Sequence, residues 1–495
     1  MLRWQKIVSV AIGILPWISA CRGPTPKSLS CRPSTETPST ESIEASQNLK
    51  EMDIFVDASG SMLGYLGERP ANDHDHSTYY VQTLKSLSQI FEGSDAIRVD
   101  YHRIENEKRE ISRQEYRSAQ LPIFYDGSQP RKFPQVSSPI EKAFSYRFLE
   151  DKVKVIITDL GQNTGDITKL QKIIKEKYLQ YQNQNYAVGV WALKSQFSGN
   201  VYLPNTQDII QDEVPSFYYQ TTENDPETYR PVYVIVLGYR PHVEEVFNKI
   251  KRSVGELLNK SNSHVHIFSP YRVFRRIALP TEYPKLSSNL KPKQDSIHNG
   301  DAIVTAKDSS YELIEIPNRF PVNIDASSKA HTNRLDFNHE LVLQPAAYTL
   351  NVLPEGIEPR IDVKVFDKFQ EHFTIKPDDP KLKEGIINLK KAIQLSNWEL
   401  DESENRLRFQ MEFQTSEIEQ SGIYKLEIDL VATDWQEPTW WKEWDWENRE
   451  SNRDGSRIQN LLPFLRGLKE LTVELKDSQN QPPIFGRLCY AIHQK

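Results

Sequence analysis

Three features are scarce in this sequence of 495 residues, and each scarcity excludes a class of protein. Basic residues are not in excess, because 61 Lys and Arg stand against 68 Asp and Glu, for a net charge of −7. We therefore expect no nucleic-acid partner, which would require a basic domain. There are only three cysteines, so the fold is not expected to depend on disulfides. Beyond the N-terminus, no apolar run is long enough to cross a bilayer.

The N-terminus has the order of charges and apolar residues that is typical of a signal peptide. The positive start MLRWQK is followed by the apolar stretch IVSVAIGILPWISA, and Ile18-Ser19-Ala20-Cys21 ends it. This ending resembles the lipobox of bacterial lipoproteins, although that family usually has Leu in place of Ile18. An ordinary secretory signal is the alternative. We expect a signal peptide over residues 1–20 and a lipid on Cys21 that anchors the protein to a membrane of the cell envelope, in a leaflet that the sequence does not identify.

The composition after Cys21 predicts a linker followed by an α/β domain. Residues 21–48 are rich in Pro, Ser and Thr and nearly free of large apolar groups, so we expect a flexible tether there. From 49 to 262, short apolar runs alternate with segments of helical period. This alternation predicts a doubly wound, mostly parallel sheet with helices on both faces. Residues 198–230 interrupt the rhythm and are expected to form an insertion.

After residue 263 the hydrophobic pattern changes to the period of antiparallel strands. Leu407, Phe409, Met411 and Phe413 alternate with polar residues, and other segments near 361 and 424 do the same. We expect a β-rich region over 263–345 and a sandwich-like β domain over 346–495 that ends with a helical segment.

The stretch FVDASGSMLGY, residues 55–65, is the strongest candidate for a functional site. An apolar run ends in Asp57, and Ser59 and Ser61 follow at intervals of two residues. A phosphate-binding loop would need more glycines and a Lys, and a nucleophile elbow would need Gly-x-Ser-x-Gly. Three oxygen donors on one tight turn suit a hard divalent cation better. The alternative is that these side chains only cap a turn.

The spacing Asp57-x-Ser59-x-Ser61 after a strand resembles the signature of von Willebrand factor A (VWA) domains, whose metal-ion-dependent adhesion site lies at the carboxyl edge of the sheet. That family adds a Thr on a second loop, a position that Ser138 takes here in Ser137-Ser138-Pro139-Ile140. Its third loop ends Thr-Asp-Gly, where this chain has Thr158-Asp159-Leu160-Gly161, with the glycine one position late.

The resemblance implies a site for Mg²⁺ or Mn²⁺ and a function in recognition rather than catalysis. The serines would be direct ligands, and Asp57 and Asp159 would act mainly through waters. A protein partner would supply an acidic residue to the open position of the metal. We expect the motif loop to be exposed, so that removing Asp57 leaves the fold intact.

Two other functions stay open at this point. One is a metal-dependent hydrolase of the envelope. The other is a structural assembly factor that binds through DWQEPTWWKEWDWEN, where Trp435, Trp440, Trp441, Trp444 and Trp446 lie close together. If exposed, these side chains would form a binding platform. Packing inside the last domain is the interpretation we favour.

Overall fold

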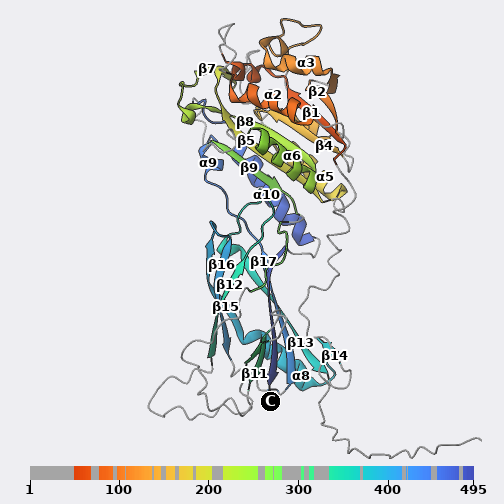
Figure 1. The fold of residues 1–495 in the computed structure, drawn as a ribbon, viewed down its shortest axis with the longest axis vertical. Helices are drawn as coiled ribbons and strands as arrows, with labels where there is room; N and C mark the ends of the chain where they lie inside the picture. The colour runs from red at the N-terminus through yellow and green to blue at the C-terminus, as the bar shows by residue number, and fades with distance from the viewer. Residues whose placement is uncertain are drawn as a thin grey trace, which may run out of the picture.

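The computed structural model describes most of the chain between residues 49 and 494. The described residues are 49–67, 77–92, 97–105, 108–136, 139–145, 152–161, 167–181, 185–202, 216–254, 262–270, 273–280, 303–305, 312–316, 334–367, 372–414, 420, 422–446, 454–478 and 483–494. Cys21, Ser138 and the predicted linker over 21–48 lie outside them. Figure 1 shows an elongated molecule with an α/β part at one end and β-sheets at the other. Among the described residues, no helix is long and apolar enough to cross a membrane.

The α/β part is built on a seven-stranded sheet with the order β3-β2-β1-β4-β8-β5-β9. The strands are β1 (Glu51–Asp57), β2 (Arg98–Ile104), β3 (Lys108–Ile111), β4 (Lys152–Thr158), β5 (Tyr186–Ser195), β8 (Arg230–Tyr239) and β9 (Ser263–Phe268). β1 pairs in parallel with β2 and β4, and the other neighbours pair antiparallel. Consequently β2, β1, β4 and β5 run in one direction, and β3, β8 and β9 run in the other. Four of the seven strands thus share one direction, which confirms the prediction of a largely parallel sheet, although β1–β2 and β1–β4 are the parallel neighbours.

Helices cover both faces of this sheet, because its central strands are apolar on both sides. Every residue of β4 and β5 is buried. One face packs against α2 (Tyr79–Glu92) and α6 (Arg240–Ser253). The other face packs against α4 (Glu141–Ser145) and α5 (Ile167–Gln180), in a core that continues into the C-terminal half. A short helix α3 (Arg113–Arg117) follows β3.

Two features of the sheet differ from the simple alternation that the sequence suggests. β8 enters antiparallel between β4 and β5, after a hairpin of β6 (Ser198–Tyr202) and β7 (Ser216–Gln220) within the predicted insertion. The sheet also continues past residue 262, the predicted end of this domain, since β9 pairs with β5.

The C-terminal half contains two further sheets. A six-stranded sheet has the order β10-β11-β18-β17-β13-β14, and a three-stranded sheet has the order β12-β16-β15. The elements are β10 (Ile303–Thr305), β11 (Glu312–Ile316), β12 (Arg334–Val342), β13 (Ile357–Asp367), β14 (His372–Thr374), α8 (Pro380–Lys391), β15 (Ile393–Asp401), β16 (Arg406–Gln414), β17 (Gly422–Ala432) and β18 (Ile484–Gln494). All pairs except β11 with β18 are antiparallel. The predicted antiparallel strands are therefore confirmed, with Leu407, Phe409, Met411 and Phe413 of β16 all buried.

The two C-terminal sheets contact each other through β12 and β18. The hydroxyl of Tyr490 lies 2.6 Å from Nε2 of His339, and both side chains are buried. Gly486 lets β18 approach β12, because a Cβ there would lie 2.6 Å from Cδ1 of Leu341. Apolar packing between the sheets therefore joins them into one core.

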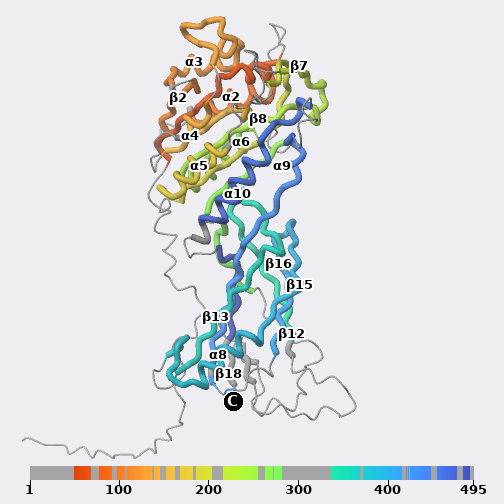
Figure 2. The backbone as a smooth tube through the Cα atoms, turned by 180° about the vertical axis from the view of Figure 1, so that it is seen from behind, coloured from red at the N-terminus to blue at the C-terminus, as the bar shows by residue number. Residues whose placement is uncertain are grey.

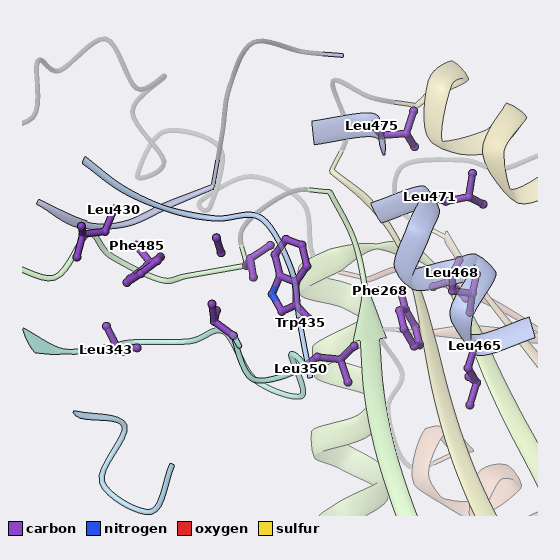
Figure 3. Close-up of a cluster of buried hydrophobic side chains, with 14 of the residues drawn as sticks. Phe268, Leu343, Leu350, Leu430, Trp435, Leu465, Leu468, Leu471, Leu475 and Phe485 are labelled. Carbon is purple, nitrogen blue, oxygen red and sulfur yellow. The ribbon is translucent and has the colours of Figure 1, made fainter. Parts of the chain in front are cut away.

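The chain then returns to the α/β part through α9 (Trp440–Glu443) and α10 (Leu461–Ser478). α10 lies along α5, where Nζ of Lys175 is 2.6 Å from Oε1 of Glu474. Figure 2 shows this return from behind, with α10 beside α5. In Figure 3, Leu465, Leu468 and Leu471 of α10 face Phe268 of β9. The two halves of the chain thus share one hydrophobic cluster.

Candidate functional site

Asp57 ends β1 and organises the loop that follows it. Its Oδ1 accepts a hydrogen bond of 2.9 Å from the backbone N–H of Ser59. Its Oδ2 accepts one of 2.7 Å from the hydroxyl of Thr158. Because β1 and β4 are parallel, with Val56 opposite Ile157, the two strands end side by side. Pairing of the strands therefore brings the first and third predicted metal loops together.

The two motif serines lie on the tight turn that the sequence predicts. Ser59 precedes the 3₁₀-helix η1 (Gly60–Leu66), and its Oγ lies 2.9 Å from Oγ of Ser61. Ser59 also forms an isolated parallel bridge with Val136, so the chain just before the second predicted loop runs beside the motif. The predicted ligand of that loop, Ser138, lies outside the described residues.

Asp159 follows β4 and is completely buried. Its Oδ1 accepts a hydrogen bond of 2.9 Å from the backbone N–H of Gly161. Leu160 has a φ of 58°, the left-handed conformation that a glycine adopts more easily. The shifted glycine still has a role, since a Cβ at Gly161 would lie 2.9 Å from Oδ1 of Asp159. Gly161 therefore gives the carboxylate room to fold back onto the loop.

The donor set suits a hard divalent cation. Oδ2 of Asp159 is buried without a hydrogen-bond partner, which is unusual for a carboxylate oxygen and leaves an acceptor for a cation or its water. Asp57, Ser59 and Ser61 supply oxygen atoms on the neighbouring strand end. In the part of the chain that the structure describes, His, Cys, Asp and Glu form no metal-binding group of three or more. The candidate site is of a different kind, because two of its four described donors are the hydroxyls of Ser59 and Ser61 and the other two are the carboxylates of Asp57 and Asp159.

The prediction that the motif loop is exposed is wrong for the carboxylate of Asp57, which is buried. Asp57 is 0% exposed and Ser59 is 8% exposed. The carboxylate is held against the end of β4 by its hydrogen bond from Thr158. Beside it, the chain at the start of the β6–β7 hairpin packs on η1 so closely that a Cβ at Gly64 would lie 2.4 Å from the ring of Phe197. The hydroxyl of Tyr202 comes to 3.5 Å from the position that a Cβ would take at Gly60. The site is therefore covered on one side by the insertion.

A buried arginine side chain that the sequence pattern does not indicate lies beside the site. Arg230 is the first residue of β8 and is 3% exposed, and its Nη2 lies 3.9 Å from Oδ2 of Asp159. Its Nη1 donates hydrogen bonds of 3.1 Å to the carbonyl of Gly455 and 3.0 Å to that of Arg457. The neighbouring Tyr65 donates its hydroxyl to the carbonyl of Pro231, and burial raises the pKa of that hydroxyl. Because β8 runs antiparallel to β4, its first residue lies at the carboxyl edge, which local sequence patterns do not reveal.

The tryptophan-rich segment does not form an exposed platform. All five tryptophans are buried, with exposed fractions from 0% for Trp441 to 7% for Trp446. Trp440, Trp441 and Trp444 pack on β9 of the α/β part rather than inside the last domain alone, whereas Trp435 forms a β-bridge with Val352 of the C-terminal half. The ring of Trp440 stacks on His264 of β9 at 4.8 Å between centroids, and Nζ of Lys194 lies 5.5 Å from the ring centroid of Trp444. Burial lowers the pKa of His264 to about 4 and, with the charge of His264, that of His266 to about 3.

The cysteines divide between the described and undescribed parts of the chain. Cys489 of β18 is buried and disulfide-bonded. Cys21, the predicted lipidation site, and Cys31 lie outside the described residues. The lipid anchor therefore stays a prediction.

No protein-family model, curated protein or solved structure matches this chain.

Proposed function

We propose that this chain is a membrane-anchored lipoprotein of the cell envelope whose α/β domain binds a protein partner through Mg²⁺ or Mn²⁺. The observation that carries the proposal is the position of Asp57. Its two oxygens hold the motif turn and the end of β4 together, with the hydroxyls of Ser59 and Ser61 within 2.9 Å of each other. On the adjoining loop, Oδ2 of Asp159 is buried without a hydrogen-bond partner and lies 3.9 Å from Nη2 of Arg230.

In this proposal Ser59, Ser61 and Ser138 hold the cation directly, and Asp57 and Asp159 hold it through waters. The cation supplies an open coordination position for a carboxylate of the partner. Keeping the full charges away from direct contact would leave the cation electrophilic enough to attract that external group. The chain's own residues fix the turn, and the hairpin β6–β7 shields it on one side.

We also propose that the α/β part is a VWA-like domain. A VWA-like domain is supported by the neighbouring strands β2, β1 and β4, by helices on both faces and by a motif at the carboxyl edge. The C-terminal sheets would form a sandwich-like spacer. In Figure 1 the hairpin beside the site and the end of β18 lie at opposite ends of the molecule. Such a spacer would present the site away from the rest of the chain.

Calorimetric titration of the full chain with Mg²⁺ and Mn²⁺ tests the proposal. Asp57→Asn keeps the shape of the side chain but removes its charge, so we expect cation binding to be lost or weakened at least about tenfold. Asp126→Asn is a matched control, because Ser128 donates its backbone N–H to Oδ1 of Asp126 at 2.8 Å in an exposed turn of the same spacing. Equal binding by the wild-type protein and Asp57→Asn would refute the proposed site, as would no uptake by the wild-type protein at millimolar cation with an acidic partner present.

A further inference from the structure

Arg230 places a permanent positive charge against the candidate cation site. It is 3% exposed, and its Nη2 lies 3.9 Å from Oδ2 of Asp159. An arginine keeps its proton throughout the physiological pH range. The charge is also held in place: Nη1 donates to two carbonyls of the 454–458 segment, and the guanidinium lies 5.3 Å from the ring centroid of Phe197.

The contact between Arg230 and Asp159 contributes charge without a hydrogen bond. A separation of 3.9 Å is too long for one. Accordingly, Oδ2 of Asp159 and Nε of Arg230 are both buried with no hydrogen-bond partner. Arg230 therefore leaves the carboxylate oxygen available to a cation or its water, while its charge acts on whatever binds there.

The sum of charges decides what this site binds. Two carboxylates, those of Asp57 and Asp159, and the guanidinium of Arg230 have formal charges that sum to one negative charge. Adding a divalent cation leaves one positive charge in a buried setting, and one external carboxylate brings the sum to zero. Uncompensated charge is costly where water is excluded. Without Arg230, the cation and the two aspartates would already be neutral, and a carboxylate would add an unbalanced charge.

We infer that Arg230 makes the binding of the divalent cation and the partner's carboxylate depend on each other. It weakens binding of the cation alone and strengthens binding of the two together. This inference rests on the proposed cation site and deepens it, because it names Arg230 as the residue that selects an anionic partner. Linkage requires the effect to be reciprocal, so the cation also raises the affinity for the carboxylate by the same factor.

Mn²⁺ titration of the full chain, with and without acetate at fixed ionic strength, measures this dependence. Free Mn²⁺ is corrected for its weak complex with acetate in solution. For the wild-type protein we expect acetate to lower the Kd of Mn²⁺ by about tenfold. For Arg230→Met we expect Mn²⁺ alone to bind about tenfold more tightly than to wild type and the acetate effect to fall within about twofold.

Arg240→Met is the matched control for loss of a buried arginine. Arg240 follows the last residue of β8, is 1% exposed, and donates to the hydroxyl of Thr349 at 2.8 Å in the C-terminal half. It lies at the opposite edge of the sheet, so its loss should leave the Mn²⁺ affinity and the acetate effect unchanged. Arg230→Lys keeps the charge and should retain the acetate effect. If Arg230→Met does not fold, the measurement on Arg230→Lys tests the inference instead.

The outcomes separate this inference from the proposed function. If the wild-type protein binds Mn²⁺ but Arg230→Met has the same affinity and the same acetate effect, the role of Arg230 is refuted and the cation site stands. If Arg230→Lys folds and loses the acetate effect, charge is not the cause and the inference also fails. If neither the wild-type protein nor Arg230→Met binds Mn²⁺ under any condition, the proposed function itself fails.

Discussion

Replacing Asp57 with alanine is expected to destabilise the domain as well as to remove a site residue. The side chain is 0% exposed and accepts hydrogen bonds from the N–H of Ser59 and the hydroxyl of Thr158. Alanine would leave both donors buried without this acceptor, at about 1–3 kcal/mol each. We expect a total loss of about 2–6 kcal/mol, a large part of the roughly 5–15 kcal/mol that stabilises a typical domain.

Urea unfolding of the wild-type protein and Asp57→Ala, followed by circular dichroism, measures this loss. Asp126→Ala removes the exposed counterpart of the same turn and should change stability by less than about 0.5 kcal/mol. In Mg²⁺ the difference for Asp57→Ala should widen, because a ligand at 100 times its Kd adds about 2.7 kcal/mol to the protein that binds it. A free energy of unfolding for Asp57→Ala within about 0.5 kcal/mol of wild type, without Mg²⁺, would show that the buried hydrogen bonds do not hold the loop.

Four further predictions concern the site, the interface between the two halves and the anchor. Gly161→Ala should weaken Mn²⁺ binding by about tenfold in calorimetry, because its Cβ would lie 2.9 Å from the adjacent carboxylate; unchanged affinity would contradict this. Burial lowers the pKa of His264 to about 4 and that of His266 to about 3, so the folded state favours the neutral imidazoles. Their contribution to stability is therefore fully present above about pH 6.5, where the unfolded chain is neutral at both residues as well. Their contribution falls as pH drops from about 6.5 towards 4, so the protection factors of the β9 amides, corrected for the intrinsic exchange rate at each pH, should decrease over that range. Unchanged protection factors would refute this. Cys21→Ser should release the protein from membranes or leave an unprocessed precursor, whereas normal fractionation and processing would rule out the lipid anchor. A fragment of residues 49–262 lacks β9 and the tryptophan segment, so limited proteolysis should find it less resistant than the full chain; equal resistance would mean that the docked segment contributes little.

The local parts of the candidate site could be predicted from the sequence. Asp57, Ser59 and Ser61 lie within five residues, and the turn that joins them is set by hydrogen bonds between near neighbours. Apolar runs such as KVKVIITDL mark buried strands directly, so the meeting of Asp57 and Asp159 at one edge followed from parallel pairing.

The parts that depend on long-range pairing could not be predicted. Arg230 reaches Asp159 only because β8 enters the sheet between β4 and β5, and its flanking residues carry no sign of that strand order. The cover over η1 depends on the β6–β7 hairpin and on Phe197 just before it, whose ring packs on Gly64. The tryptophans are apolar whether they form an exposed platform or pack inside the protein, so their composition does not distinguish the two. Their partner, β9, lies roughly 170 residues earlier in the chain.

The docking of Trp440 and α10 on the α/β part has a consequence for the order of synthesis. Ribosomes add roughly 5–20 residues per second, so the segment that packs on β9 emerges roughly 10–40 s after that strand. During that interval Phe268 and the apolar side of α5 lack their cover. The first domain along the chain is therefore completed by some of the last residues to be made, and a nascent chain that stalls before residue 440 would expose this apolar face.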